Sequence, residues 1–132
     1  MRIVLDTNVL VSALLTPEGP PASIINALLA GTVELLADNR ILFEYEDVLN
    51  RRKFGFEPRD VRSLLDFLKH ECRYVAATTA TSSFEDPADL PFYEVALSGN
   101  ADYLVTGNSK HYPDKDWILS PRQFLRILHA RE

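Results

Sequence analysis

Apolar residues recur along the chain in two patterns: short continuous runs, and longer segments in which they lie three or four positions apart. The short runs are typical of buried strands and cover residues 3–5, 33–37, 73–76, 103–105 and 117–119. Helical spacing covers residues 9–15, 22–30, about 40–52, 59–71, 87–98 and 121–130. Strands that alternate with helices predict an α/β fold, a three-layer α/β/α sandwich with a central parallel sheet of about five strands.

Glycine, proline and capping residues mark the ends of these elements. Gly31 and Gly99 end two helices, whereas Asp86, followed by proline, and Ser120, in a capping box, each begin one. No repeat, low-complexity segment or internal boundary interrupts the pattern. The length suits one hydrophobic core better than two, so we expect a single domain over residues 1–132.

The formal net charge of -5 argues against a surface that binds nucleic acid through charge alone, because such domains are usually basic. Composition does not exclude a locally basic strip. The candidate is Arg51-Arg52-Lys53, with Arg59 and Arg62 further along, and a solvated helix end explains these residues at least as well. An acidic active site would add to the negative total.

Cys72 is the single cysteine, which excludes an intrachain disulfide and a cysteine-based zinc site. It lies in an apolar stretch and is expected to fill the core rather than to act as a nucleophile. One cysteine also fits a reducing compartment. We expect no signal peptide and no membrane span, because no apolar run is long enough, and we therefore expect a cytoplasmic protein.

The first strand stops directly at a carboxylate, Asp6. Ligands of open parallel sheets bind beyond the carboxyl ends of the strands, so Asp6 lies where such a fold carries out its chemistry. A second interpretation is open, in which Asp6, Thr7 or Asn8 only caps the next helix. Residues 106–108 (Thr-Gly-Asn) follow the strand over 103–105, and they are expected beside Asp6 if both strands are central.

The helix from about residue 40 carries two acids that border its buried face. Ile41, Tyr45 and Val48 define the inward stripe, with Glu44 on one flank and Glu46 on the other. Periodicity does not choose between these two glutamates.

A later helix places Asp89 in its first turn, where the helix dipole favours a carboxylate. The acid shares the buried stripe with Phe92, Tyr93, Ala96 and Leu97. In the alternative interpretation Asp86 caps the helix and Asp89 only completes its first turn.

Acids without accompanying cysteines or paired histidines suit hard cations, Mg²⁺ or Mn²⁺, better than zinc. Such ions usually serve phosphate substrates, because they neutralise charge, activate water and hold the leaving oxygen. Carboxylates gathered at one rim would repel each other unless a cation compensated their charge. A divalent cation is therefore the favoured cofactor.

Four blocks of sequence, in this order and spacing, resemble the PIN-domain family over essentially the whole chain. They are Asp6-Thr-Asn-Val-Leu, Glu44-Tyr45 ahead of Val48-Leu49, Asp86-Pro-Ala-Asp89 ahead of Ala96, and residues 101–108 (Ala-Asp-Tyr-Leu-Val-Thr-Gly-Asn). The resemblance implies a parallel-sheet α/β/α sandwich and metal-dependent cleavage of RNA, often by the VapC-like toxin of a toxin–antitoxin pair.

The resemblance also assigns roles to individual residues. It implies that Asp6, Glu44 and Asp89 occupy the three leading acidic positions, which selects Glu44 over Glu46 by analogy. Asp86 would be a further acid near the metal as well as a cap. Thr106 and Asn108 would line the site, and Asn8 would brace the first turn.

One position departs from the family pattern. Many relatives carry an aspartate at the position of Asn108, three residues later, or both, but here the residues are Asn108 and His111. A neutral imidazole is a poor Mg²⁺ ligand, although it tolerates Mn²⁺ better. His111 would then be a substrate contact or, as we favour, a polar loop residue, and Asp114 or Asp116 would supply the missing carboxylate.

These features leave three functional hypotheses. The first is an Mg²⁺- or Mn²⁺-dependent endoribonuclease that acts on RNA and pairs with a cognate antitoxin protein. The second, motivated by Asn108 and His111, is a PIN-fold module that binds RNA or protein without cutting. The third is phosphoryl transfer in the haloacid-dehalogenase style, which is disfavoured because Asn8 replaces its second aspartate and Lys110 is a weak candidate for its lysine.

Phe43 points away from the inward stripe of its helix and is expected to be an exposed aromatic that marks a partner surface. With the habit of the family that the chain resembles, this suggests a homodimer.

Overall fold

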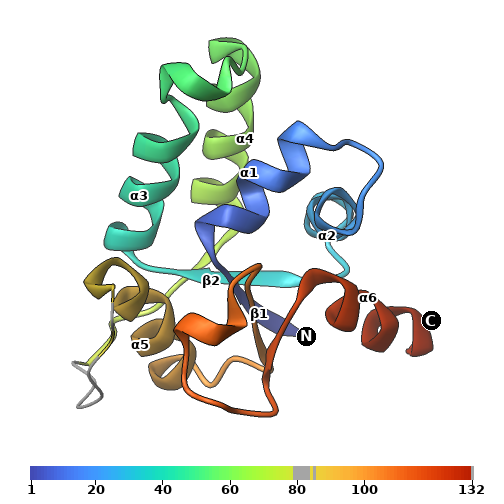
Figure 1. Ribbon diagram of the computed structural model, residues 1–132, viewed down its shortest axis with the longest axis vertical. Helices are drawn as coiled ribbons and strands as arrows, with labels where there is room; N and C mark the ends of the chain where they lie inside the picture. Colours follow the sequence, from blue (N-terminus) through green and yellow to red (C-terminus); the bar gives the residue numbers. More distant parts are fainter. Residues whose placement is uncertain (79–83, 85, 132) are drawn as a thin grey trace.

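Five strands form one parallel sheet in the described part of the chain, residues 1–78, 84 and 86–131 of this computed structural model (Figure 1). The sheet order is β3-β2-β1-β4-β5, and every neighbouring pair is parallel. The strands are β1 (Arg2–Leu5), β2 (Glu34–Ala37), β3 (Arg73–Tyr74), β4 (Tyr103–Val105) and β5 (Ile118–Leu119). The predicted parallel sheet is confirmed.

Six α-helices in the described residues cover this sheet: α1 (Thr7–Leu15), α2 (Pro20–Leu29), α3 (Asn39–Leu49), α4 (Pro58–Glu71), α5 (Leu90–Ser98) and α6 (Pro121–Ala130). Helix α5 packs on β1, β2 and β4, whereas α3 and α4 pack on β2. Figure 1 shows α5 on one side of the sheet and α1 to α4 on the other, with α6 beside α2. The three layers of the sandwich are therefore as predicted. None of the helices described is both long and apolar enough to cross a membrane.

The central strands are buried because helices cover both faces of the sheet. Ile3, Val4 and Leu5 of β1 are each 0% exposed, and so are Leu104 and Val105 of β4. The two continuous apolar runs of the sequence are thus the middle of the core, and the residues that follow them emerge together at one edge.

Helix α3 is shorter than the sequence pattern predicts. It ends at Leu49 rather than near residue 52, and the chain continues through a 3-10 turn, η1 (Arg52–Phe54), to Gly55. Gly55 has φ 66°, a left-handed conformation that glycine adopts without steric cost. Helix α2 in turn begins at Pro20, two residues earlier than expected, because proline suits the first helical position.

The expected helix after Asp86 is divided into a 3-10 turn, η2 (Pro87–Asp89), and α5. The predicted stripe is wrong at Leu97, which is 48% exposed, whereas Val95 and Glu94 are buried. Helix α5 contacts three strands and also α3, so its buried face is wider than a single stripe. The polar loop that the sequence predicts over residues 78–83 lies outside the described residues except for Thr78.

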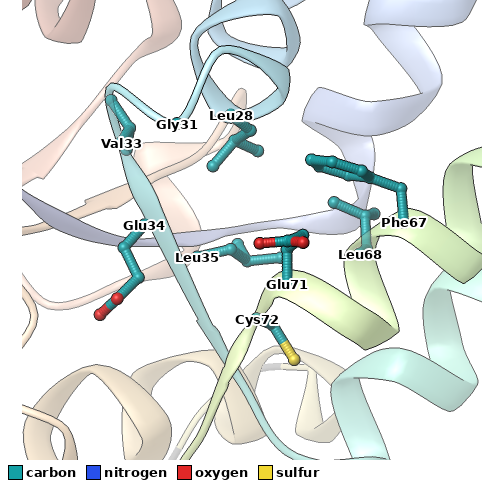
Figure 2. Close-up of a pocket in the computed structure, with 9 residues that line it drawn as sticks. All are labelled: Leu28, Gly31, Val33, Glu34, Leu35, Phe67, Leu68, Glu71 and Cys72. Carbon is teal, nitrogen blue, oxygen red and sulfur yellow. The ribbon is translucent and has the colours of Figure 1, made fainter.

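Cys72 follows α4 and lines a small cleft of about 130 Å³ between α2 and α4 (Figure 2). Apolar side chains that include Leu28, Leu35 and Phe67 form most of its walls. Burial raises the pKa of the Cys72 thiol, which lowers its reactivity at neutral pH. Cys72 packs against the core, in agreement with its predicted role as a filler.

The hydroxyl of Tyr45, a fully buried residue of α3, donates a 2.7 Å hydrogen bond to the carbonyl oxygen of Leu5 at the end of β1. Substitution Tyr45→Phe should lower the free energy of unfolding by about 1–2 kcal/mol, because the buried bond is lost without a new partner. Urea unfolding measures the change. The control is Tyr74→Phe at an exposed tyrosine, where a change within about 0.5 kcal/mol is expected. Equal effects at both positions would contradict the role of this bond.

Candidate active site

The candidate site lies where β1 and β4 end side by side. Leu5 pairs with Val105, and the next amide, that of Asp6, donates a 2.9 Å hydrogen bond to the Val105 carbonyl. From β1 the chain crosses to β2 on one side of the sheet, while β4 lies on the other side of β1. This reversal is the topological switch point at which open α/β sheets bind ligands.

Asp6 is buried, and two hydroxyl groups hold one of its carboxylate oxygens. Its Oδ2 accepts hydrogen bonds from Thr106 Oγ1 at 2.8 Å and from Tyr112 OH at 3.0 Å. Burial raises the pKa of Asp6, and the hydrogen bonds from Thr106 and Tyr112 oppose that rise. Asp6 occupies the N-cap position of α1, where the backbone amides of Thr7 and Asn8 also oppose the rise of its pKa. The sheet edge and the first residues of α1 therefore both act on this carboxylate.

Glu44, on α3, faces the same edge. Its Oε2 accepts a short hydrogen bond from the hydroxyl of Thr7, the residue next to Asp6. Burial raises the pKa of Glu44, and the charges of Asp6 and Asp86 add to the rise. Glu46 instead lies on the other flank of α3, with its Oε1 3.7 Å from Nζ of Lys69.

Asp89 completes the acidic edge from η2 at the beginning of α5. Its Oδ2 is buried and has no hydrogen-bond partner in the described residues, although His111 Nδ1 lies 3.6 Å away. Burial raises the pKa of Asp89 to about 6, and the charges of Asp6 and Asp86 contribute to the rise. His111 belongs to the 3-10 turn η3 (Ser109–His111) and faces an acid of the site.

Asp86 acts on the site from its exposed rim. Its Oδ1 accepts a 2.9 Å hydrogen bond from the Ala88 amide, which caps η2. Its charge also raises the pKa of both Glu44 and Asp89, so the carboxylate is electrostatically coupled to the two acids.

Asn8 ties the two strand ends together. Its Oδ1 accepts a 3.0 Å hydrogen bond from the Gly107 amide. A Cβ at position 107 would lie 3.3 Å from this oxygen, so glycine permits the close approach. The amide of Asn108 donates to Thr106 Oγ1 at 3.0 Å, while the Asn108 residue itself is exposed. Asn8 therefore contacts the end of β4 directly, across the edge of the sheet.

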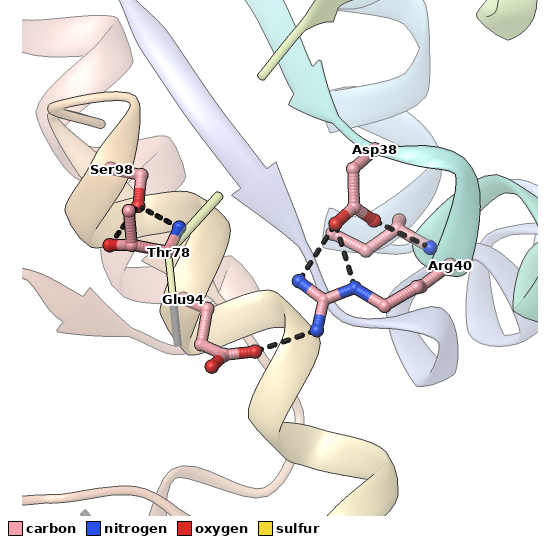
Figure 3. A network of polar contacts seen from close by, with 6 residues as sticks. Asp38, Arg40, Thr78, Glu94 and Ser98 are labelled. Carbon is pink, nitrogen blue, oxygen red and sulfur yellow. Dashed lines mark hydrogen bonds and ion pairs between the residues drawn. The ribbon is translucent and has the colours of Figure 1, made fainter. Parts of the chain in front are cut away.

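Arg40 joins the helices that carry Glu44 and Asp89. Its guanidinium contacts Asp38 Oδ2 at 2.8 Å and Glu94 Oε1 at 2.7 Å (Figure 3). Asp38 also caps α3 by accepting a 3.0 Å hydrogen bond from the Ile41 amide. The network fixes the beginning of α3 against the middle of α5, and so the separation of the acids on these two helices.

Several residues of this arrangement are not singled out by the sequence pattern: Thr7, Tyr112, Arg40 and Glu94. The sequence could have drawn attention to Glu94, because it is an acid amid the apolar residues of α5. Tyr112 had a weaker one, an aromatic directly after His111 in a polar loop. The contacts of Thr7 and Arg40 depend on tertiary packing, which spacing along the chain does not reveal.

Asp114 and Asp116 lie away from the charges that act on the site. Both are exposed and line a separate hollow of about 670 Å³ between the β4–β5 connection and the start of α6. Neither is among the groups with the largest effects on the pKa of Asp6, Glu44 or Asp89. The structure therefore gives no support to these aspartates as substitutes for a carboxylate at position 111.

The donor set of the site fits a hard divalent cation. Among the described residues no three side chains of His, Cys, Asp or Glu already form a metal-binding group. However, the acids are oxygen donors, two of them have pKa values raised by neighbouring carboxylates, and Asp89 Oδ2 is buried without a hydrogen bond. A cation at this edge would relieve the repulsion and would give the unpartnered oxygen a partner.

The chain is similar to one known protein family and to a solved structure. The family described as PIN domain matches residues 2–110. A solved structure of VapBC2 from Rickettsia felis, bound to a DNA fragment from its promoter, is similar with a TM-score of 0.59 and 20% sequence identity, over 91% of this chain and 98% of that one. No curated protein matches the sequence significantly.

Substitution Asp89→Asn should stabilise the metal-free protein at neutral and higher pH. The pKa of about 6 lies above the value of 3.8 for a free carboxyl, so ionisation of Asp89 costs stability as the pH rises through this window. In EDTA we expect a gain of about 1 kcal/mol in the free energy of unfolding at pH 8, reduced for partial solvent screening, and no gain near pH 4. Urea unfolding at the two pH values measures it, with the exposed Asp66→Asn as control. A gain that does not depend on pH would contradict the electrostatic origin.

Proposed function

The chain belongs to the PIN-domain family, and we propose that it is a divalent-metal-dependent endoribonuclease that cleaves RNA phosphodiester bonds. PIN domains are generally nucleases. The observation that carries the proposal is the buried, unpartnered Oδ2 of Asp89, which faces the charges of Asp6 and Glu44 at the switch point of the sheet. Acids gathered at one edge suit a metal and a phosphate substrate better than they suit the stability of the metal-free fold.

In this proposal Asp6, Glu44 and Asp89 hold the cation, with Asp86 as a further acid at the rim. Mg²⁺ or Mn²⁺, when bound, would activate a water molecule and neutralise the charge of the scissile phosphate. Carboxylate oxygens are the ligands that both ions accept, so the donor set does not discriminate between them.

The chain's own residues orient these acids. Thr106 and Tyr112 occupy Oδ2 of Asp6 and so fix the plane of its carboxylate. Thr7 does the same for one oxygen of Glu44. Asn8 holds the end of β4 against the beginning of α1, and we propose that the exposed Asn108 lines the path of the substrate beside it. Thr106 was expected to line the site as well, but it is 0% exposed and acts through its hydrogen bond to Asp6. Such preorganisation lowers the cost of arranging ligands when the ion binds.

A second candidate function rests on His111. Its Nδ1 lies 3.6 Å from Asp89 Oδ2, where a protonated imidazole would compete with a metal for this carboxylate. A chain with such a contact could retain RNA or protein binding while its cleavage is weak. We propose a substrate contact as the role of His111 in the active form and treat the non-cleaving module as the alternative.

We further propose that the protein is the toxin of a toxin–antitoxin pair and that a cognate antitoxin protein is its partner. The similar solved structure is that of a VapBC2 complex bound to promoter DNA, and the chain spans nearly all of the matched chain. Action on cellular RNA would place the protein in the cytoplasm, which also fits its single cysteine.

A homodimer is the other proposed assembly. Phe43 is 70% exposed on α3 and borders, with Leu42 and Tyr74, a shallow groove of about 490 Å³ next to the edge strand β3. An exposed aromatic beside a short sheet edge is a typical contact between protein copies.

RNA cleavage in the presence of Mn²⁺ or Mg²⁺ tests the proposed activity. We expect Asp6→Asn to lower the cleavage rate by at least about 100-fold, because loss of a direct metal ligand should exceed the effect of altering an outer contact. EDTA should abolish cleavage by the wild-type protein. The matched control is Asp66→Asn, an exposed aspartate of α4 that should leave cleavage unchanged. Equal cleavage by wild type and Asp6→Asn, or cleavage in EDTA, would contradict the proposed activity. RNA binding without cleavage would favour the second candidate function, the non-cleaving module.

Static light scattering tests the proposed dimer. We expect the wild-type protein to have twice the mass of the 14.9 kDa chain and Phe43→Ser to dissociate at micromolar concentration, because the substitution removes an apolar anchor. The control is Leu29→Ser, at another exposed apolar residue on α2, which should remain dimeric. A wild-type monomer, or dissociation by both variants alike, would rule out a dimer through Phe43.

A further inference from the structure

The turn between α3 and α4, together with the first residues of α4, concentrates positive charge in an otherwise acidic chain. Residues 51–62 hold five of its 14 Lys and Arg residues but only two of its 19 Asp and Glu residues. Figure 1 shows this turn at the end of the α3–α4 pair that is remote from the sheet. Arg52 and Lys53, in η1, are exposed and form no ion pair within the described part of the chain.

Two aromatic rings lie stacked beside these cations. The rings of Phe54 and Phe56 are 5.5 Å apart with an interplanar angle of 11°, and Lys53 Nζ lies 5.1 Å from the centre of the Phe54 ring. Gly55 between them has φ 66°, which lets the chain reverse so that neighbouring side chains stack. Phe56 packs against the core, whereas Phe54 covers Phe56 and is itself only half-buried.

The basic turn is electrostatically connected to the acidic site. Arg51, which begins the turn, lowers the pKa of Glu44 through its charge. Its guanidinium also contacts Asp47 at 3.1 Å on the surface of α3. Helix α3 therefore connects the acidic edge, the proposed metal site, to the basic turn. The turn presents the positively charged side chains of Arg52 and Lys53 and the ring of Phe54.

We propose that residues 51–56 bind single-stranded RNA that extends from the acidic edge along α3, an inference that rests on the proposed ribonuclease function. Exposed Arg52 and Lys53 provide the positive charge to contact backbone phosphates. Phe56 stacks on the Phe54 ring and Lys53 Nζ lies over it, so an unstacked base takes the place of Lys53, whose ammonium group then contacts a phosphate. A base inside a duplex is already stacked, so the turn selects single strands.

Fluorescence anisotropy with the full chain tests this in EDTA, where cleavage is prevented. The probes are a labelled RNA single strand of about 12 nucleotides and a blunt RNA duplex of the same length. The double variant R52Q/K53Q should bind the single strand about tenfold or more weakly and should reduce the slope of log affinity against log salt by about 1.4. Phe54→Ala should weaken single-strand binding about fivefold or more and leave duplex binding unchanged. The control is Arg126→Ala, at an exposed cation of α6.

The possible results separate this inference from the proposed function. The inference is overturned if R52Q/K53Q and Phe54→Ala bind the single strand as tightly as the wild type does. It is also overturned if the wild type does not bind the single strand, even when the protein cleaves RNA. If the variants alter light scattering but not RNA affinity, the turn binds protein and the inference is again overturned. If RNA affinity falls as expected while no metal restores cleavage in the wild type, the RNA surface stands and the proposed nuclease function fails.

Discussion

The burial of a carboxylate at the end of β1 is the constraint to which the rest of this structure is adjusted. Asp6 is 6% exposed, and an acid held away from water needs hydrogen-bond donors or a cation. Thr106 and Tyr112 supply donors from the end of β4 and from the loop that follows it. The position of β4 beside β1 and the turn after β4 are thus linked by one buried group.

The other acids reach this edge on two helices that belong to opposite faces of the sheet. Repulsion between Glu44 and Asp89 would tend to separate α3 from α5, and the contacts of Arg40 with Asp38 and Glu94 oppose that separation. The guanidinium of Arg40, which stabilises this arrangement, contacts Asp38 and Glu94 and not the acids of the site. The fold therefore keeps the acids near each other without neutralising them, a condition that favours function over stability.

Much of this arrangement could be predicted from the sequence, because it depends on local patterns. Buried runs located β1 and β4, and the residues directly after them had to share an edge in a parallel sheet. The width of the buried face of each helix was less predictable. Leu97 is exposed and Glu94 is buried because α5 packs on both the sheet and α3, which a single periodic stripe does not encode. The roles of Tyr112 and Arg40 could not be predicted, because they depend on contacts with Asp6 and Glu94, which are distant in sequence. The choice of Glu44 over Glu46 followed only from family resemblance, and the contact with Thr7 gives it a physical basis.

The connection from β4 to β5 contains no α-helix, unlike the other crossovers of the sheet. It carries Thr106, His111 and Tyr112 across the edge in irregular chain and a single 3-10 turn. A segment without a packed helix can change its length or side chains while the core stays intact. Divergence among related proteins should therefore accumulate in this connection, so that new substrate preferences arise there while Asp6 and its strand remain as they are.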